Sequence, residues 1–285
     1  MLDPMGNGLK PKPRTALRLA AGKRFYTWRR YIEWLFDHER YASGRSTESL
    51  PHPVAAHDTP TLRPLKDVDM QLQYNKEINL QLAIARLDGT VLQPGETFSY
   101  WKLIGKPSRR NGYVPGMVLF YGGFRPGVGG GLCQLSNLIY WITLHTPLRV
   151  IERHRHSYDV FPDANRTQPF GSGATCSYNY LDLRIRNETQ HAYQLRLELR
   201  DHRLYGMWLS DGLPVYRYEI YERSHRIMQA YWGGYVRQNV IGRRTRNLQG
   251  ELIADDVVAE NHALMMYSPL LQEAGADEAA AANRE

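Results

Sequence analysis

The sequence predicts an α+β domain with a mainly antiparallel sheet, a buried helix that follows a glycine-rich loop, and an N-terminal helical extension. Three observations predict this class. Helix-like and strand-like segments do not alternate regularly along the chain, as they would in a doubly wound parallel fold. Residues 180–209 alternate apolar and polar side chains, which is typical of strands with one buried face. Residues 132–146 are nearly all apolar, which is typical of a buried helix.

Residues 1–50 are predicted to be a basic amphipathic helical extension. The helical pattern covers residues 14–41, where apolar side chains recur at spacings of three and four and form one stripe. This stripe consists of Phe25, Trp28, Ile32 and Leu35. Two interpretations stay open. The helix docks on the rest of the protein with a solvated basic face, or it lies on a membrane surface with its aromatic rings at the lipid boundary.

The remaining elements follow in order. Residues 51–66 are rich in Pro, Ser and Thr and are predicted to be a linker. The main domain is assigned to residues 67–270. It begins with a helix over 67–88, which ends at Gly89, and continues through a turn at 93–96 between two short strands.

The second half of the domain is predicted to be mostly strands. Residues 180–209 are expected to form one β-hairpin, with its two alternating runs joined across residues 187–191. Residues 214–222 and 234–241 are expected to be further strands. The last segment, residues 271–285, is rich in Ala and acidic residues and is predicted to be a flexible tail.

Composition excludes several classes of protein. Of the net charge of +7 over 285 residues, +6 lies in residues 1–66, which hold 12 Lys and Arg against 6 Asp and Glu. The nearly neutral remainder argues against a nucleic-acid partner. An apolar fraction of 42% excludes disorder along the whole chain, and two cysteines exclude a disulfide scaffold.

The chain shows no membrane span and no export signal. No run approaches the roughly 18 apolar residues that a spanning helix needs. The basic N-terminus lacks the apolar core of a signal peptide. The sequence therefore predicts a cytoplasmic protein, or one held peripherally on the cytoplasmic membrane by its N-terminal helix.

The densest chemical signal is GGFRPGVGGGLCQLS, residues 122–136. Glycine is costly to order, so such a run is expected where the backbone takes positive φ or closely approaches a ligand. It leads directly into the buried helix and places Cys133 in the first helical turn. Free N–H groups and the positive helix end stabilise a thiolate there, and they can also hold an oxyanion during acyl transfer. A buried structural cysteine is the alternative.

Two histidines follow in the segment RHRHS. His154 and His156 are two residues apart and would share one face of a strand. A cysteine at a helix N-terminus followed by a histidine on a strand is the layout of papain-like and NlpC-type thiol enzymes. We expect His156 to be the base, because Ser157 and Asp159 could help orient its ring, and His154 to support it. The candidates for the group that orients the base are Glu152, Asp159, Asp163, Asn165 and Asp182.

A zinc site is the competing interpretation of the same residues. Cys133, His154, His156 and Cys176 would form a Cys2His2 set. The cysteines, however, lack the tight pairing that structural zinc sites use. We therefore expect no metal and no other cofactor.

These motifs resemble those of the VanW family, first named among vancomycin-resistance accessory proteins. The resemblance is carried by PGETFSYWKLIG, NGYVPGMVLF, GGGLCQLSNLIY and ERHRHS, and it extends from about Pro64 to Pro269. It implies a VanW-like domain over residues 67–270. Many members carry Asp-Ala-Thr after the histidines, where this chain has Gly173-Ala174-Thr175. An aspartate at that position is therefore not available to orient the base.

The resemblance also implies an activity. In larger cell-surface proteins this domain has been associated with L,D-transpeptidation of peptidoglycan, with the motif cysteine as nucleophile. Cys133 would then attack a stem peptide or precursor and release a terminal D-Ala, and an amine acceptor would resolve the thioester. The residues expected to contact the substrate are Gly129, Gly130, Gly131, Gln134, Ser136 and Arg153. The alternative is a non-catalytic accessory or binding module for cell-wall peptide or glycan.

Overall fold

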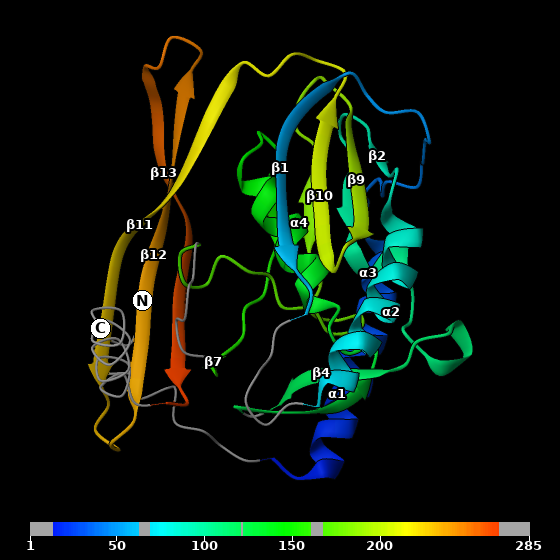
Figure 1. Ribbon diagram of the computed structural model, residues 1–285, viewed down its shortest axis with the longest axis vertical. Helices are drawn as coiled ribbons and strands as arrows, with labels where there is room; N and C mark the ends of the chain where they lie inside the picture. The colour runs from blue at the N-terminus through cyan, green and yellow to red at the C-terminus, as the bar shows by residue number, and fades with distance from the viewer. Residues whose placement is uncertain (1–13, 63–68, 121, 161–167, 268–285) are drawn as a thin grey trace, which may run out of the picture.

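The computed structural model describes residues 14–62, 69–120, 122–160 and 168–267. It consists of a body, in which helices and sheets surround an apolar core, and a long antiparallel sheet beside that body (Figure 1). The predicted α+β class with an N-terminal helix is confirmed. The expected tail over 271–285 lies outside the described residues.

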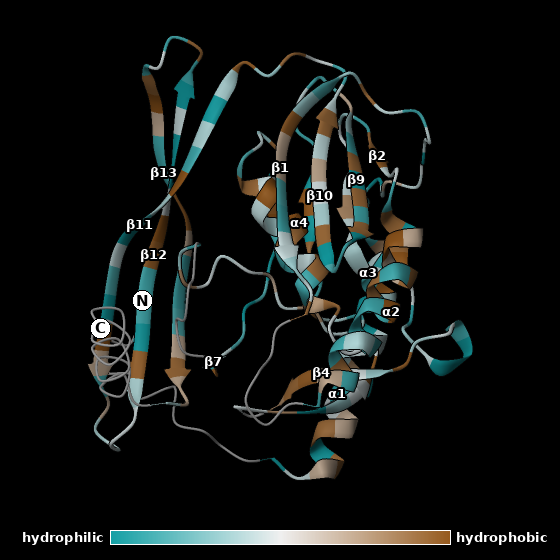
Figure 2. Ribbon diagram, viewed as in Figure 1, coloured by the Kyte–Doolittle hydropathy of each residue, from teal (hydrophilic) through white to brown (hydrophobic). Residues whose placement is uncertain are grey.

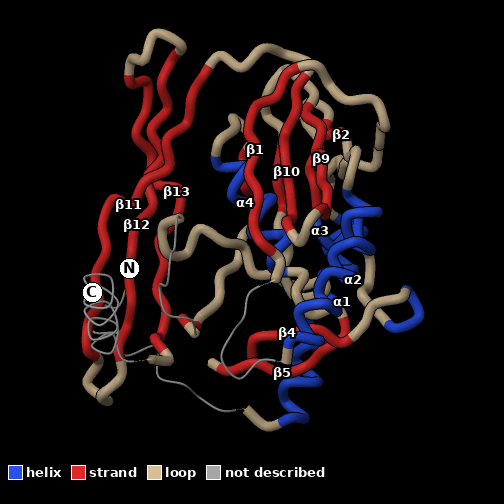
Figure 3. Tube along the Cα trace, viewed as in Figure 1, coloured by secondary structure: helices blue, strands red, loops and turns tan. Residues whose placement is uncertain are grey.

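The body contains four α-helices among the described residues and most of the shorter strands (Figure 3). In chain order these are α1 Ala16–Phe36, β1 His52–Pro60, α2 Met70–Leu87, β2 Val91–Leu92, β3 Thr97–Ser99, α3 Tyr100–Ile104, β4 Pro115–Phe120, β5 Gly123–Val128, α4 Cys133–Leu144, β6 Arg149–Glu152, β8 Arg184–Arg186, β9 Tyr193–Arg200 and β10 Arg203–Ser210. The long sheet contains β7 Tyr158–Asp159, β11 Tyr216–Gln229, β12 Tyr235–Asn247 and β13 Leu252–Met265.

The body is built on two sheets and a hairpin. One sheet has the antiparallel order β1-β10-β9-β2, and a smaller one has the order β3-β8-β6. Among the described residues, strands β4 and β5 pair only with each other. In the long sheet, β11, β12 and β13 are antiparallel, and the short β7 joins β13 in parallel.

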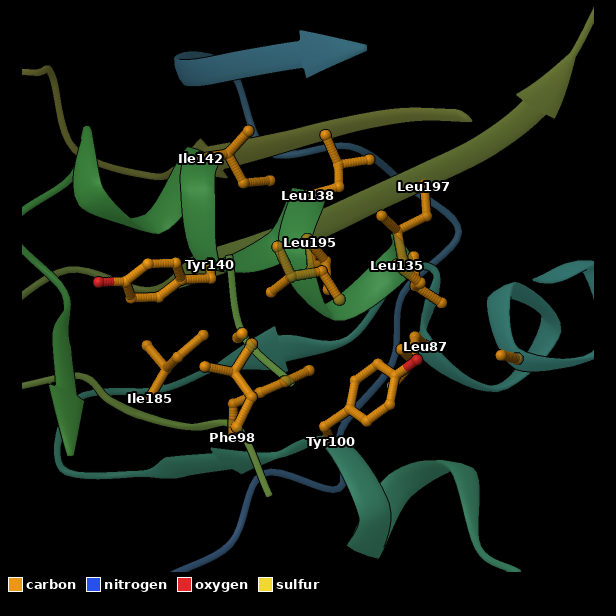
Figure 4. Close-up of a cluster of buried hydrophobic side chains, with 14 of the residues drawn as sticks. Leu87, Phe98, Tyr100, Leu135, Leu138, Tyr140, Ile142, Ile185, Leu195 and Leu197 are labelled. Atoms are coloured by element: carbon orange, nitrogen blue, oxygen red, sulfur yellow. The ribbon is translucent and has the colours of Figure 1, made fainter. Parts of the chain in front are cut away.

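Helix α4 lies in the core of the body, as its apolar sequence predicted. It packs on the sheet that contains β1, β9 and β10, and Leu135, Ile139 and Trp208 there are fully buried. Figure 4 shows Leu135 and Leu138 of the helix close to Leu195 of β9. The indole Nε1 of Trp208 donates to Thr143 Oγ1 at 3.0 Å, which satisfies a polar group that burial would otherwise penalise. This packing fixes the start of α4, and therefore Cys133, relative to the sheet.

Residues 52–60 do not form the predicted linker. They form strand β1, which pairs along its length with β10 at the edge of the main sheet. Proline lacks an N–H donor and is therefore confined largely to edge strands, so Pro53 and Pro60 suit this position. Upstream, Ala42 N–H donates to Thr97 O at 3.0 Å, which joins the N-terminal segment to the body.

The predicted hairpin over 180–209 is also wrong in its pairing. The run that includes β8 pairs with β3 and β6, whereas β9 pairs with β10. The true hairpin turns at Asp201 and His202, whose φ values of 51° and 54° are those of a type I′ turn. The helix ending at Gly89, the turn over 93–96 and strands over 214–222 and 234–241 are confirmed, but β13 completes the long sheet as a third strand that the sequence did not predict.

Helix α1 contacts the body through a polar side chain. Arg30 is 6% exposed, although it is an arginine on a surface helix. The apolar stripe of this helix points away from the body, and the coloured bands in Figure 2 show apolar residues along the helix. No helix within the described ranges is long and apolar enough to span a bilayer.

Candidate functional site

The glycine run before α4 has a structural cause. Gly131 has a φ of +94°, a conformation that side-chain-bearing residues rarely adopt. Gly130 packs against the backbone of Gly116 in β4, where a Cβ on Gly130 would lie 2.2 Å from the Gly116 carbonyl carbon. Gly130 is therefore required by a close approach of two backbone segments of this chain.

Two buried side chains hold this loop in place. Asn79 of α2 donates from Nδ2 to the carbonyls of Val114 and Gly130, at 3.0 and 2.9 Å, and accepts from Val114 N–H at 2.9 Å. The Tyr100 hydroxyl donates to the carbonyl of Leu132 at 2.9 Å. The glycine loop that precedes Cys133 is thus held by hydrogen bonds to α2 and α3.

Cys133 is the first residue of α4 and lies beside a second cysteine. The sulfur atoms of Cys133 and Cys176 are 3.6 Å apart, and both thiols are free and half-buried. As a neutral thiol, Cys133 can also donate to the Cys176 carbonyl at 3.5 Å. As a thiolate, it accepts from the Cys176 thiol and gains the favourable field of the helix N-terminus.

The two cysteines titrate in opposite directions. A hydrogen bond from Cys176, followed by the hydrogen bond and charge of His156, lowers the pKa of Cys133 well below its usual value, and this outweighs burial. Burial, together with the neighbouring Cys133, raises the pKa of Cys176 well above its usual value. The negative charge of the pair therefore resides on Cys133.

The two histidines have different partners. His156 interacts with Cys133, whereas His154 Nε2 lies 2.9 Å from Glu152 Oε1. The expectation that the histidines share one face of a strand is wrong, because β6 ends at Glu152 and residues 153–156 are a loop. The N–H of Thr175 donates to the His154 carbonyl at 2.8 Å and joins this loop to the segment that carries Cys176.

Glu152 links the histidine loop to α1. Both of its oxygens accept from the Arg30 guanidinium, at 2.5 and 2.7 Å, and Oε1 also accepts from the Asp182 N–H at 3.2 Å. Burial opposes ionisation, but the hydrogen bonds of His154 and Arg30 hold the pKa of Glu152 at about 2. The sequence does not predict this pair, because Arg30 and Glu152 are 122 residues apart and neither belongs to a motif that predicts the other.

The described carboxylates are engaged with groups other than His156. Asp159 pairs with Arg237 at 3.3 Å, and Asp182 accepts from Ser99 Oγ at 2.5 Å. Burial raises the pKa of Asp182 to about 7. The two remaining candidates, Asp163 and Asn165, lie outside the described residues. The structure therefore assigns none of the described candidates to His156.

The predicted substrate contacts Gln134 and Ser136 have partners within the chain. Gln134 Nε2 donates to the Pro60 carbonyl at 2.9 Å and ties α4 to the end of β1. Ser136 Oγ is buried and donates to the Ala174 carbonyl at 2.6 Å. Both side chains therefore position the cysteine segments, and their role toward a substrate remains a prediction.

Arg153, another predicted substrate contact, also has its hydrogen-bond partners within the chain. Its Nε donates to the Gly173 carbonyl at 2.8 Å, another nitrogen donates to the Gly171 carbonyl, and Nη1 donates to Asn261 Oδ1 at 3.1 Å. The segment before Cys176 is thereby tied to strand β13 of the long sheet.

Neither of two large surface cavities includes the cysteines. Their volumes are about 520 and 790 Å3, and both are lined in part by His57 of β1. Within the described part of the chain, no three His, Cys, Asp or Glu side chains are grouped as a metal site would require. In particular, His154 pairs with Glu152 and does not join Cys133, Cys176 and His156.

Comparison with known proteins identifies the family. The chain is 32% identical over 237 residues to the vancomycin B-type resistance protein VanW of Enterococcus faecalis, and the match covers 83% of this chain and 86% of that protein. The chain belongs to the VanW family. The family model described as VanW like protein matches residues 75–209, from α2 to β10. The uncharacterized protein YoaR of Bacillus subtilis is 30% identical over 118 residues, 41% of this chain and 37% of that protein. No solved structure matches.

The VanW-matched region contains both cysteines and both histidines. Helix α1 and the three long strands β11, β12 and β13 lie outside it. The site is thus carried by the region that the family model matches, while Arg30 and Asn261 reach it from segments on either side.

Proposed function

We propose that this VanW-family protein is a cysteine-dependent acyl transferase or hydrolase that acts on peptidoglycan-type peptides. The observation that carries the proposal is the position of Cys133 at the first residue of α4, with its sulfur 3.6 Å from that of Cys176; these contacts and His156 lower the pKa of Cys133. A half-buried thiolate at a helix N-terminus beside an imidazole is the arrangement that thiol enzymes use for nucleophilic attack.

The proposed reaction has two steps. The Cys133 thiolate attacks the carbonyl carbon of the scissile amide, and the N–H of Cys133 at the start of α4 stabilises the oxyanion. The C–N bond breaks, His156 protonates the leaving amine, and a thioester remains on Cys133. In the second step His156 takes a proton from an amine or a water, which attacks the thioester. A new amide or a carboxylate forms, and the thiolate is restored.

Cys176 is assigned a positioning role. Its own pKa is raised, so it remains a protonated donor to the Cys133 sulfur over the pH range in which Cys133 is ionised. We expect iodoacetamide at about pH 6.5 to label Cys133 before Cys176, as judged by mass spectrometry of peptides. Preferential labelling of Cys176 would contradict the assignment.

The substrate class rests on the family. The Enterococcus faecalis relative is named for vancomycin resistance, and the family resemblance associates the domain with L,D-transpeptidation of cell-wall peptides. A tetrapeptide stem that ends in D-Ala is therefore the first substrate to test, with D-Ala as the leaving amine.

Intact-mass analysis after incubation with stem tetrapeptides tests the proposal. We expect an adduct on the protein, release of D-Ala, and complete loss of both in Cys133→Ala. His156→Ala should be nearly as inactive, since a nucleophile and its base act as a unit. His154→Ala serves as the matched control and should retain much more activity. If Cys133→Ala still processes the peptide, the enzyme proposal fails; if wild type binds the peptide without an adduct or product, the binding-module alternative replaces it.

A further inference from the structure

We infer that α1 attaches this protein to an anionic membrane surface through the apolar stripe that faces away from the body. In the structure Leu17 extends the stripe of Phe25, Trp28, Ile32 and Leu35 toward the start of the helix, and all five side chains are between 57% and 81% exposed. At 3.6 residues per turn these side chains fall within an arc of about 80°, along about 27 Å of helix. A continuous, outward-facing apolar stripe of this length is characteristic of interfacial helices.

The opposite side of the helix accounts for its attachment to the body. Arg30 lies about 180° around the helix from the centre of the stripe. It donates to Glu152 and to the carbonyl of Tyr180, and the Tyr31 hydroxyl lies 2.7 Å from that of Tyr178. The stripe is therefore not needed for docking, and the ion pair holds α1 with its apolar face turned outward.

The charge distribution around the stripe identifies the partner. The exposed cations in the first part of the helical segment are Arg14, Arg18, Lys23, Arg24 and Arg29, and residues 14–32 contain no Asp or Glu. The first acidic residues, Glu33 and Asp37, pair with Arg184 of the body, at 2.9 and 3.4 Å. Of the cations, Arg18, Arg24 and Arg29 lie within about 80° of the centre of the stripe, and Glu33 and Asp37 do not offset them. A basic flank along an apolar stripe matches anionic lipid headgroups above an apolar layer.

A second copy of this chain fits the stripe less well. A symmetric pair of α1 helices would bring two sets of like charges together, with no acidic residue between 14 and 32 to compensate them. Anionic lipid removes this repulsion and accepts the aromatic rings of Phe25 and Trp28 at the boundary between headgroups and acyl chains.

Sedimentation of the full-length protein with vesicles tests the inference. With vesicles of equal parts phosphatidylcholine and phosphatidylglycerol at low salt, we expect binding at least about tenfold tighter than with phosphatidylcholine alone. High salt should weaken it. The double variant Phe25→Glu/Trp28→Glu should lose at least about tenfold in affinity while keeping the wild-type far-UV circular dichroism and thermal midpoint. The matched control is Leu213→Glu, which changes a 70% exposed apolar side chain far from the stripe and should leave binding unchanged.

Two results would overturn the inference. One is equal binding by the wild type and the double variant to anionic vesicles. The other is absence of vesicle binding together with a wild-type dimer that the double variant converts to a monomer, which would assign the stripe to a second copy of the chain. Vesicle binding is measured without any catalytic readout, so its failure would leave the proposed activity untouched, and the reverse also holds.

Discussion

The body and the long sheet are both antiparallel structures, but they are stabilised differently. In the body, β9 and β10 bury large apolar side chains such as Leu195 and Trp208 against α4, in one extensive core. In the long sheet, the buried apolar cluster comprises Ala230, Val236 and Leu264, with Tyr158 and Trp232 packed against it. Ile220 and Val258 of the long sheet also pack against the core of the body. The body thus derives its stability mainly from apolar burial, and the long sheet, with fewer apolar contacts, depends more on a second source.

That source is a chain of buried polar side chains. Asn261 Nδ2 donates to Asn239 Oδ1 at 2.9 Å, and Asn239 donates to the Phe170 carbonyl at 2.7 Å. Arg153, next to the proposed catalytic loop, donates to Asn261. Buried amides are costly unless they are hydrogen-bonded, so this network fixes one geometry between the sheet and the site. Apolar burial stabilises the body, and polar pairing specifies how the long sheet is placed on it.

A matched pair of leucines gives the largest expected difference between the two regions. Leu195→Ala in β9 removes a fully buried side chain from the extensive core, and we expect a loss of about 4 kcal/mol in the free energy of unfolding. Leu264→Ala in β13 makes the same chemical change in the small cluster and should cost about 2 kcal/mol, because its surroundings can relax. Urea denaturation followed by circular dichroism measures both. Equal losses would remove the energetic distinction between the two regions.

Breaking the polar network should lower the free energy of unfolding by less than Leu195→Ala does, and the loss of structure should be confined to the long sheet. Asn261→Ala removes the donor to Asn239 Oδ1 and the acceptor of Arg153 Nη1, so we expect a loss of about 2 kcal/mol and faster proteolysis within the long sheet. Asn247→Ala, at the end of β12, removes solvent-accessible hydrogen bonds with Glu251. This control should cost less than about 1 kcal/mol. A wild-type proteolysis pattern in Asn261→Ala would show that the network does not hold the sheet.

The smallest expected effect is the change in the free energy of unfolding with pH that arises from Glu152 in the body. The pKa of Glu152 is about 2 in the folded protein, below its value in the unfolded chain, so its contribution is present above about pH 4.5 and lost as the pH falls toward 2. Allowing for partial exposure, we expect this contribution to be about 1 kcal/mol.

Comparison with Glu152→Gln isolates this contribution. The variant should be less stable near neutral pH and should lose less stability on acidification than the wild type. Asp182 contributes with the opposite sign, because its pKa of about 7 is raised by burial and stability falls as the pH rises from about 4 to 7. Identical acid profiles for the wild type and Glu152→Gln would mean that the Arg30 pair does not stabilise the body.

Local sequence determined much of the secondary structure. The apolar run before Pro147 predicts α4 and its burial, and Gly89 marks the end of α2. Glycines followed by Cys133 predict a cysteine at a helix N-terminus, because helix polarity is a local property of the backbone. The family could also be predicted from the motifs around this cysteine.

Only the tertiary structure decided which segments meet. It pairs β8 with β3 and β6, makes residues 52–60 an edge strand, and brings Cys176 to Cys133 across 43 residues of sequence. The apolar stripe of α1 faces outward because Arg30, on the opposite side of the helix, pairs with Glu152 of the body. Periodicity shows that a segment has an apolar face, but it does not show what that face contacts. Partner choice depends on the summed burial and hydrogen bonding of segments far apart in the chain, which no local pattern encodes.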